Sequence, residues 1–106
     1  MNEFSLPGNT LSGECMRHFR QGSNLAYAAI IGCFSERLSR FVQEQTGDAK
    51  ATSDIVQSSF NRLWLRHAVI ADAAGIEAFL YTEARHACVA FMALQQAKKQ
   101  ATGTGG

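Results

Sequence analysis

The stretch YAAIIGCFSERLSRFV, residues 27–42, decides the fold expected of this 106-residue chain. Its large apolar side chains recur at steps of four, three, four and three residues, which is the spacing of one face of an α-helix. Charged side chains occupy other positions, and Glu36 and Arg40 form a favourable pair one turn apart. The stretch therefore predicts a long amphipathic helix. Its apolar stripe contains Tyr27, Ile31, Phe34, Leu38 and Phe41.

This first helix is expected to extend over about residues 12–46. Ser12 can cap its start, and Glu14 places a carboxylate near the positive end of the helix dipole. Residues 22–24, Gly-Ser-Asn, mark a point at which the helix can bend or restart. Gly47 offers the left-handed conformation that ends many helices, so we expect the helix to stop there.

A second helix is expected over about residues 53–100, after a polar linker at 47–52. Its apolar stripe changes register at 73–75, so we expect a kink or a break near Gly75. Unbroken, the helix is about 70 Å long. This is more than the first helix can cover, so the chain either folds back at Gly75 or docks its C-terminal half on another molecule. The first stripe contains Val56, Phe60, Leu63, His67, Ile70 and Ala74, and the second contains Ile76, Leu80, Ala84, Ala87, Phe91 and Leu94.

The predicted fold is therefore all-α: a helical hairpin of two long amphipathic helices, coiled-coil-like and oligomeric. Residues 11–101 are expected to form a single helical domain, because a chain of this length holds at most one. Residues 1–10 carry a turn signal at 7–9 and predict a flexible arm, and the glycine-rich residues 102–106 predict a flexible tail. So short a chain buries a thin core, and outside partners are expected to matter.

Charge and composition exclude several classes of function. The formal net charge is +1 and no basic run occurs beyond Lys98–Lys99, so we expect no nucleic-acid ligand. No apolar run reaches the roughly 20 residues that span a bilayer. The N-terminal residues lack an export signal, so we expect a cytoplasmic location and no transmembrane segment. In that compartment the cysteines at 15, 33 and 88 are expected to be reduced and structural.

The residue types that carry catalysis are scattered along the chain. The histidines, at 18, 67 and 86, show no HxxxH or HExxH spacing, and His67 falls on an apolar stripe, where a hydrogen-bonded interior histidine is expected. Neither GxSxG nor SxxK occurs, and the glycines are single or terminal, so no phosphate-binding loop is predicted. We therefore expect no enzyme, no cofactor and no metal site.

The stretch at residues 27–38, together with SDIVQSSF at 53–60, resembles the phasin family. The likeness extends over about residues 26–65. It implies a non-catalytic protein, often oligomeric, that coats polyhydroxyalkanoate storage granules in a bacterial cytoplasm. The positions that answer to the family's pattern are Phe34, Arg37 and Leu38 in the first helix and Asp54, Gln57 and Phe60 in the second.

Two hypotheses of function follow. In the first, a phasin-like protein adsorbs to the surface of a hydrophobic polyester granule, which stabilises it by about 25 cal/mol per Å² of apolar surface covered. In the alternative, a helical adaptor or chaperone binds another protein by helix–helix packing. The residues expected to adsorb are Tyr27, Ile31, Phe34, Leu38, Phe41, Phe60, Trp64 and Phe79, with Glu36, Arg37, Arg40 and Arg66 facing water. The residues expected to bind a partner helix are Ile76, Leu80, Ala84 and Phe91.

Overall fold

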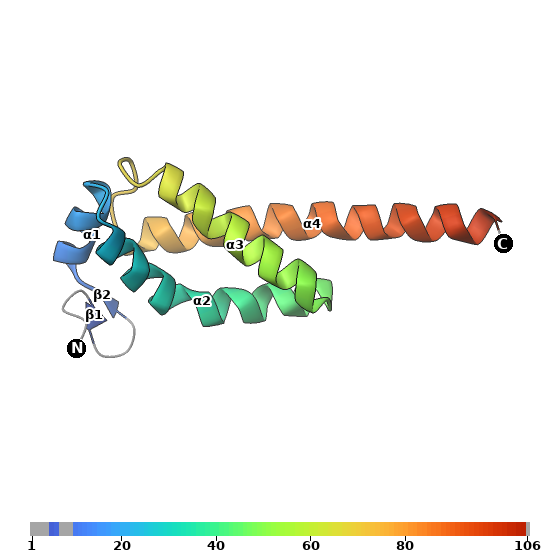
Figure 1. Cartoon of the computed structure of the whole chain (residues 1–106), viewed down its shortest axis with the longest axis horizontal. Coiled ribbons are helices and arrows are strands. Elements are labelled where there is room, and N and C mark those ends of the chain that lie inside the picture. Colours follow the sequence, from blue (N-terminus) through green and yellow to red (C-terminus); the bar gives the residue numbers. More distant parts are fainter. Residues whose placement is uncertain (1–4, 7–9, 106) are drawn as a thin grey trace.

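The computed structural model describes residues 5–6 and 10–105, and their side chains over 11–99. A short antiparallel ribbon pairs β1 (Ser5–Leu6) with β2 (Thr10–Leu11). Apart from this ribbon, the described chain is all-α (Figure 1). Its helices are α1 (Gly13–Arg20), α2 (Asn24–Thr46), α3 (Ala49–Leu65) and α4 (Ala73–Gly105).

Helices α2, α3 and α4 form a three-helix bundle in which each helix packs against the other two. α2 and α3 join in a tight hairpin at residues 47–48, and α1 packs against α2 at the opposite end (Figure 1). α4 returns along the hairpin and then continues past it (Figure 1). The molecule is consequently long and thin, measuring 58 × 25 × 19 Å with a radius of gyration of 16.4 Å. A compact domain of about 100 residues has a radius of gyration near 13 Å.

Side-chain caps fix where the helices begin. In each case a side-chain oxygen accepts a hydrogen bond from the backbone N–H three residues later, which satisfies a donor that the helix itself leaves unpaired. At the other end of α2, Gly47 adopts φ +63° and donates its N–H to the Gln43 carbonyl, so the predicted left-handed cap is confirmed. The four capping pairs are Ser12 with Cys15, Ser23 with Ala26, Asp48 with Ala51, and Asp72 with Gly75.

The predicted hairpin of two long helices is wrong, because a turn interrupts each of them. The helix expected over 12–46 ends at Arg20 and restarts at Asn24, with Gly22 at φ +88° between the two parts. The helix expected over 53–100 begins earlier, at Ala49, and is interrupted between α3 and α4 at residues 66–72. Gly75 is therefore not the break. It lies in the first turn of α4, and the predicted linker shrinks to residues 47–48.

Tertiary contacts hold the turn at residues 66–72. His67 Nδ1 donates to the carbonyl oxygen of Arg20 at 3.1 Å, and the Arg20 guanidinium donates to the Ala71 carbonyl. Ile70 inserts into the core, where it is 8% exposed. A Cβ at Gly75 would lie 3.2 Å from Ile70 Cγ2, so the missing side chain gives Ile70 its room. No glycine or proline in residues 66–72 interrupts the helix, so these tertiary contacts, and not the local helix propensity, reverse the chain.

The two predicted flexible ends fall only partly within the described residues. Of the predicted arm, residues 5–6 and 10 lie in the ribbon, and residues 1–4 and 7–9 are outside the described residues. Of the predicted tail, residues 102–105 continue α4, and Gly106 is outside the described residues. The backbone described here is therefore more regular at both ends than the sequence predicts.

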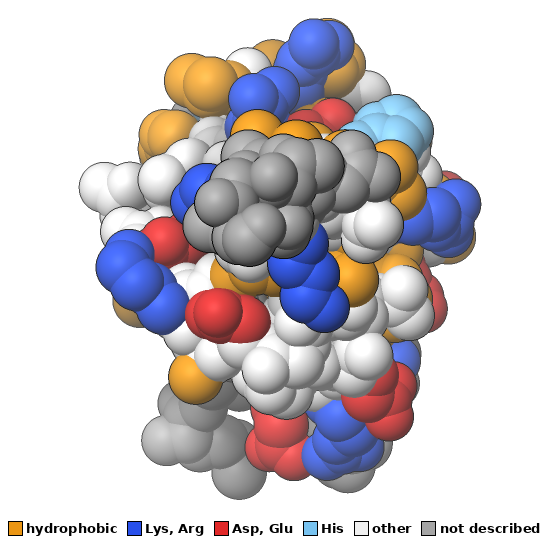
Figure 2. All heavy atoms as spheres, turned by 90° about the vertical axis from the view of Figure 1, so that its right-hand side faces the viewer, with side chains coloured by type: hydrophobic (Ala, Val, Ile, Leu, Met, Phe, Trp, Pro, Cys, Tyr) orange, Lys and Arg blue, Asp and Glu red, His pale blue; other side chains and the backbone are white. Residues whose placement is uncertain are grey.

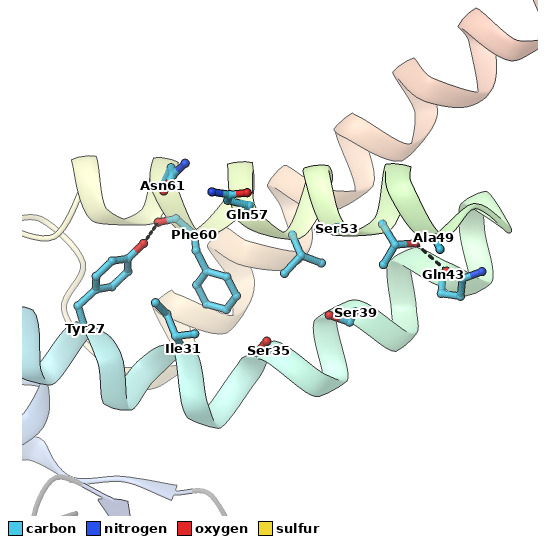
Figure 3. Close-up of a pocket in the computed structure, with 12 residues that line it drawn as sticks. Tyr27, Ile31, Ser35, Ser39, Gln43, Ala49, Ser53, Gln57, Phe60 and Asn61 are labelled. Atoms are coloured by element: carbon cyan, nitrogen blue, oxygen red, sulfur yellow. Dashed lines mark hydrogen bonds between the residues drawn. The ribbon is translucent and has the colours of Figure 1, made fainter.

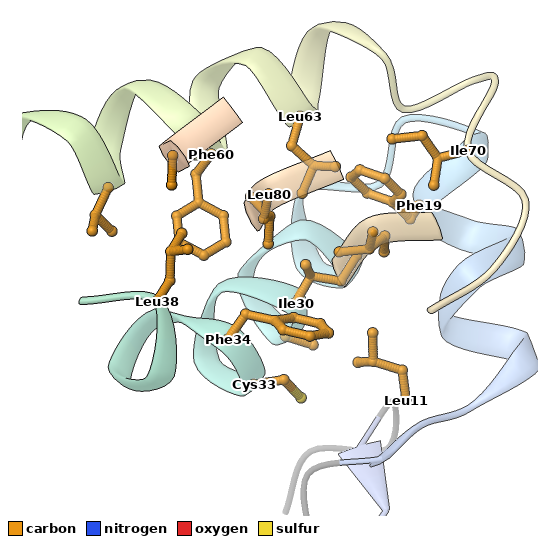
Figure 4. Close-up of a cluster of buried hydrophobic side chains, with 14 of the residues drawn as sticks. Leu11, Phe19, Ile30, Cys33, Phe34, Leu38, Phe60, Leu63, Ile70 and Leu80 are labelled. Carbon is orange, nitrogen blue, oxygen red and sulfur yellow. The ribbon is translucent and has the colours of Figure 1, made fainter. Parts of the chain in front are cut away.

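The core is one continuous apolar cluster enclosed by the four helices (Figure 4). Phe19 and Ile70 lie together at the α1 end, and Leu38 and Phe60 face each other further along the hairpin (Figure 4). Because both halves of the hairpin and the first half of α4 contribute, the bundle buries its own stripes. The largest fully buried side chains are Phe19, Ile30, Leu38, Leu63, Ile76, Leu80, Val42 and Cys15.

Candidate partner-binding surface

The side chains predicted to meet an external surface lie mostly inside the bundle. Four of them, Phe34, Leu38, Phe60 and Leu80, are buried, and so are Ile76 and Ala84 of the predicted partner-binding set. In the closed bundle these side chains contact one another. The remaining predicted residues are partly buried and pack against the core: Tyr27, Ile31, Phe41, Trp64, Phe79 and Phe91.

The second half of α4 carries three of the six large apolar side chains that are exposed among the described residues, and Leu25, Leu65 and Val69 are the other three. Residues 89–99, here named the α4 arm, are all exposed apart from Phe91, which is half-buried. Val89, Met92 and Leu94 are 64%, 47% and 62% exposed. At 100° per residue these three side chains point to different sides of the helix. A helix that is apolar all round is normally buried, so the exposure of residues 89–94, which are all apolar, is not favoured by their composition, whereas residues 95–99 are mostly polar.

A groove of about 480 Å³, here named the arm groove, lies between the base of the α4 arm and the start of α3. Lys50 and Asp54, on its rim, pair at 3.0 Å, and the Asp48 carboxylate caps α3. Viewed along the axis of the molecule, exposed hydrophobic side chains lie among charged ones (Figure 2). The apolar walls of the groove are formed by Ala51, Ile55, Ala87, Ala90, Phe91 and Leu94.

A larger groove of about 690 Å³ runs between α2 and α3 (Figure 3). Tyr27 Oη donates to the Phe60 carbonyl at 2.8 Å near one end, and Thr52 Oγ1 donates to Gln43 Oε1 at 3.0 Å near the other. None of its lining residues is charged, so it offers neither an acid–base pair nor a charge to bind. The lining side chains are Tyr27, Ile31, Ser35, Ser39, Gln43, Ala49, Thr52, Ser53, Val56, Gln57, Phe60 and Asn61.

One pocket, between α3 and α4, brings polar side chains of catalytic type together. Ser58 and His86 line a pocket of about 310 Å³ together with Arg62 and Glu83. Arg62 Nε lies 3.5 Å from Glu83 Oε1, so the carboxylate is engaged by the guanidinium. A triad needs its carboxylate to hold the imidazole, and here the carboxylate is held elsewhere. His86 is exposed.

The aromatic residues at the α1 end form a structural cluster. Trp64 lies between the rings of Tyr27, with centroids 4.7 Å apart, and His67, at 4.9 Å. Phe19 completes the cluster, with its ring 6.0–6.2 Å from the other three. His67 is thus a hydrogen-bonded residue packed among rings, as its place on the apolar stripe predicts. Trp64, expected to adsorb to an external phase, is instead part of the junction between α1, α2 and α3.

The cysteines have the environment of structural thiols. All three are buried. Burial raises the pKa of Cys15, and the nearby Cys33 raises it further, while burial alone raises the pKa of Cys88. Because the thiolate is the reactive form, a raised pKa makes Cys15 and Cys88 poor nucleophiles near neutral pH.

No protein-family model, curated protein or solved structure matches the chain. Among the described side chains, no three His, Cys, Asp or Glu residues are placed to hold a metal ion together. In the described part of the chain, no helix is both long and apolar enough to cross a bilayer. The candidate site therefore rests on geometry alone.

Two residues of the α4 arm, Val89 and Met92, fall outside both predicted stripes. The sequence still contains a signal for these two residues. They are apolar, they lie off the predicted stripes, and they belong to a helix that is too long for the rest of the chain to cover. Leu94 does lie on the second stripe, but the structure turns that end of the stripe away from the core.

Proposed function

We propose that the chain is a non-catalytic helical interaction protein that binds a partner helix along its α4 arm. The observation that supports this proposal best is the exposure of three large apolar side chains, Val89, Met92 and Leu94, on a helix that extends past its own bundle. Covering such surface contributes about 25 cal/mol per Å² before the cost of association is subtracted. The arm groove adds a second wall, so a partner helix can lie between α3 and α4 as helices do in other hydrophobic grooves.

The two halves of α4 lie in different environments, which supports this assignment. Ile76, Leu80 and Ala84 are fully buried and anchor the first half of the helix in the bundle. A partner can reach the second half without opening the core, so binding does not compete with folding. The partner helix can belong to another protein or to another copy of this chain.

Site-specific photo-crosslinking in cells tests where the partner sits. A photoreactive residue at Leu94 is expected to form an adduct with a partner, whereas the same residue at Leu65 is expected to form none. Leu65 is a matched control because it is also apolar and 78% exposed, but lies at the far end of α3. Equal labelling from both positions would contradict the assignment to the arm.

Binding by purified components gives the second test. Met92→Glu combined with Leu94→Glu is expected to weaken binding of the captured partner at least about tenfold, because two charges replace apolar contacts. Leu25→Glu combined with Leu65→Glu is the control, since both leucines are exposed at the other end of the molecule. If the two pairs of substitutions weaken binding equally, the arm has no special role.

A second candidate is the phasin-like coat of a polyhydroxyalkanoate granule, in a bacterial cytoplasm. The exposed Leu25, Leu65 and Val69, at 65%, 78% and 74%, favour it, because an apolar phase can accept scattered side chains that a protein groove cannot. Adsorption through Phe34, Leu38 and Phe60 requires the bundle to open, since all three are buried.

Co-sedimentation with polyester particles separates the two candidates. Granule coating predicts that the protein sediments with the particles, keeps its far-ultraviolet helical signal, and loses the near-ultraviolet signal of its packed rings as the bundle opens. A protein that stays in the supernatant, or that binds with its ring signal unchanged, does not adsorb through its core.

A further inference from the structure

We propose that the helix that fills the arm groove is the α4 arm of a second copy, packed antiparallel about a two-fold axis near Leu94. This proposal rests on the proposed function and names its partner. The first reason is continuity: Ala90, Phe91 and Leu94 belong both to the arm and to the wall of the groove. In an antiparallel pair, these residues of one copy meet the same residues of the other copy. A two-fold interface between identical chains requires such a shared surface.

The register follows from the geometry of α3 and α4. Asp48 and Asp54 lie on the rim of the groove beside residues 87–95 of α4, while Lys98 and Lys99 lie just beyond it. An antiparallel pair centred near Leu94 sets Ala90 of one copy beside Lys98 of the other, and both residues lie on the same face of the helix as Leu94. Each arm then lies between α3 and α4 of the second copy, so that two of its sides are covered.

Charge supports the antiparallel orientation. Lys98 and Lys99 are the only charged side chains of the α4 arm, whereas the groove rim carries Asp48, Asp54 and Lys50 and so a net charge of −1, with Lys50 and Asp54 paired within the chain. Antiparallel packing brings the lysines of one copy to the aspartates of the other, which favours association. Parallel packing sets lysine beside lysine and leaves both groove rims next to each other, so like charges meet twice.

The solution mass over a range of concentrations tests whether the dimer exists. The wild-type chain is expected to move from the monomer mass of 11.5 kDa to twice that value as concentration rises. Leu94→Glu puts two like charges at the axis and is expected to raise the dissociation constant at least about tenfold. Leu65→Glu, equally acidic and on the far end of the bundle, is expected to leave it unchanged. A monomer at every concentration overturns the proposal.

Cross-linking tests the orientation separately. When chains carrying Ala90→Cys are mixed with chains carrying Lys98→Cys, oxidation is expected to join the two variants to each other, and neither variant to itself. Links of each variant to itself indicate parallel arms and overturn the proposed packing. Charge reversal adds a check: Lys98→Glu with Lys99→Glu is expected to weaken the dimer, and Asp54→Lys in the same chain is expected to restore part of the loss.

The two proposals fail differently. One outcome is that the chain stays monomeric, a photoreactive residue at Leu94 still crosslinks to another protein's helix, and that protein binds in purified form. In that case the proposed dimer is overturned, and the proposed function of the α4 arm is supported. If the chain is monomeric and neither Leu94 nor Met92 contacts any partner, both proposals are overturned.

Discussion

At the scale of the residue, the different backbone angles of two glycines predict opposite effects on stability when each is replaced by alanine. Gly47 has φ +63°, and Gly32 lies inside α2, where a Cβ would meet nothing within 4 Å. Gly47→Ala is expected to lower the free energy of unfolding by about 1 kcal/mol, since a Cβ disfavours the left-handed region. Gly32→Ala is expected to raise it by about 0.5–1 kcal/mol, since alanine favours helix. Urea unfolding measures both, and equal effects would contradict the assigned conformations.

The buried thiols predict a loss of stability at alkaline pH. Burial raises the pKa of Cys15 and Cys88 above the usual value of about 8.5. The unfolded chain therefore releases these protons first, so the stabilisation is complete below the unfolded pKa and declines as pH rises toward the folded pKa. Cys88→Ala is expected to flatten this decline. Urea unfolding from pH 7 upward, with and without the substitution, measures it, and parallel curves would contradict the prediction.

Sequence predicts well where one residue decides the local structure. Gly47 ends α2 because the cap depends on its own φ. The apolar spacing of residues 27–42 is only partly right, because Phe34 and Leu38 are buried but Tyr27, Ile31 and Phe41 are partly buried. Sequence fails where the decision is tertiary. Nothing in residues 66–72 forbids a helix, and the reversal depends on His67 reaching the carbonyl of Arg20, 47 positions earlier in the chain.

At the scale of the element, the start of α4 depends on one carboxylate. Asp72 Oδ1 accepts the Gly75 N–H at 2.8 Å, and no glycine or proline helps to end the preceding turn. Asp72→Ala is expected to lower the free energy of unfolding by about 1 kcal/mol. Asp72→Asn keeps an oxygen at the same place and is expected to recover most of that loss. If both substitutions cost the same, the charge and not the cap matters.

The two halves of α4 are expected to respond differently to the same substitution. Leu80→Ala removes a fully buried side chain and is expected to cost about 2–5 kcal/mol of unfolding free energy. Leu94→Ala, where the side chain is 62% exposed, is expected to cost less than about 0.5 kcal/mol in a dilute, monomeric sample. Thermal or urea unfolding gives both values. A large cost at Leu94 under dilution would place it in the core and remove the arm.

The candidate site illustrates what periodicity cannot decide. A stripe that runs from Ile76 to Leu94 is continuous in sequence, yet Ile76 is buried and Leu94 is exposed. The difference arises because the α2–α3 hairpin is shorter than α4 and covers only its first half. Sequence identifies the apolar face, but the length of the neighbouring elements decides which part of that face stays open.

At the scale of the whole molecule, the bundle and the end of the arm are separable. The described side chains after Leu94 are all exposed, so they contribute little to the core. A chain ending at Gln95 is expected to keep its cooperative unfolding and near-ultraviolet signal, and to lose helicity only in proportion to the residues removed. The same truncation is expected to abolish self-association. Circular dichroism and solution mass measure the two effects, and a truncated chain that no longer unfolds cooperatively would show that the arm belongs to the core.

The position of Trp64 between Tyr27 and His67 has a practical consequence for fluorescence measurements on this protein. Trp64 is the single tryptophan of the chain, and it lies at the end of the bundle opposite the arm. Its fluorescence emission is expected to change when α1 detaches or the bundle unfolds. It is expected to stay the same when a partner binds to or leaves the α4 arm. An optical titration of binding therefore needs a dye of its own, attached near residue 99.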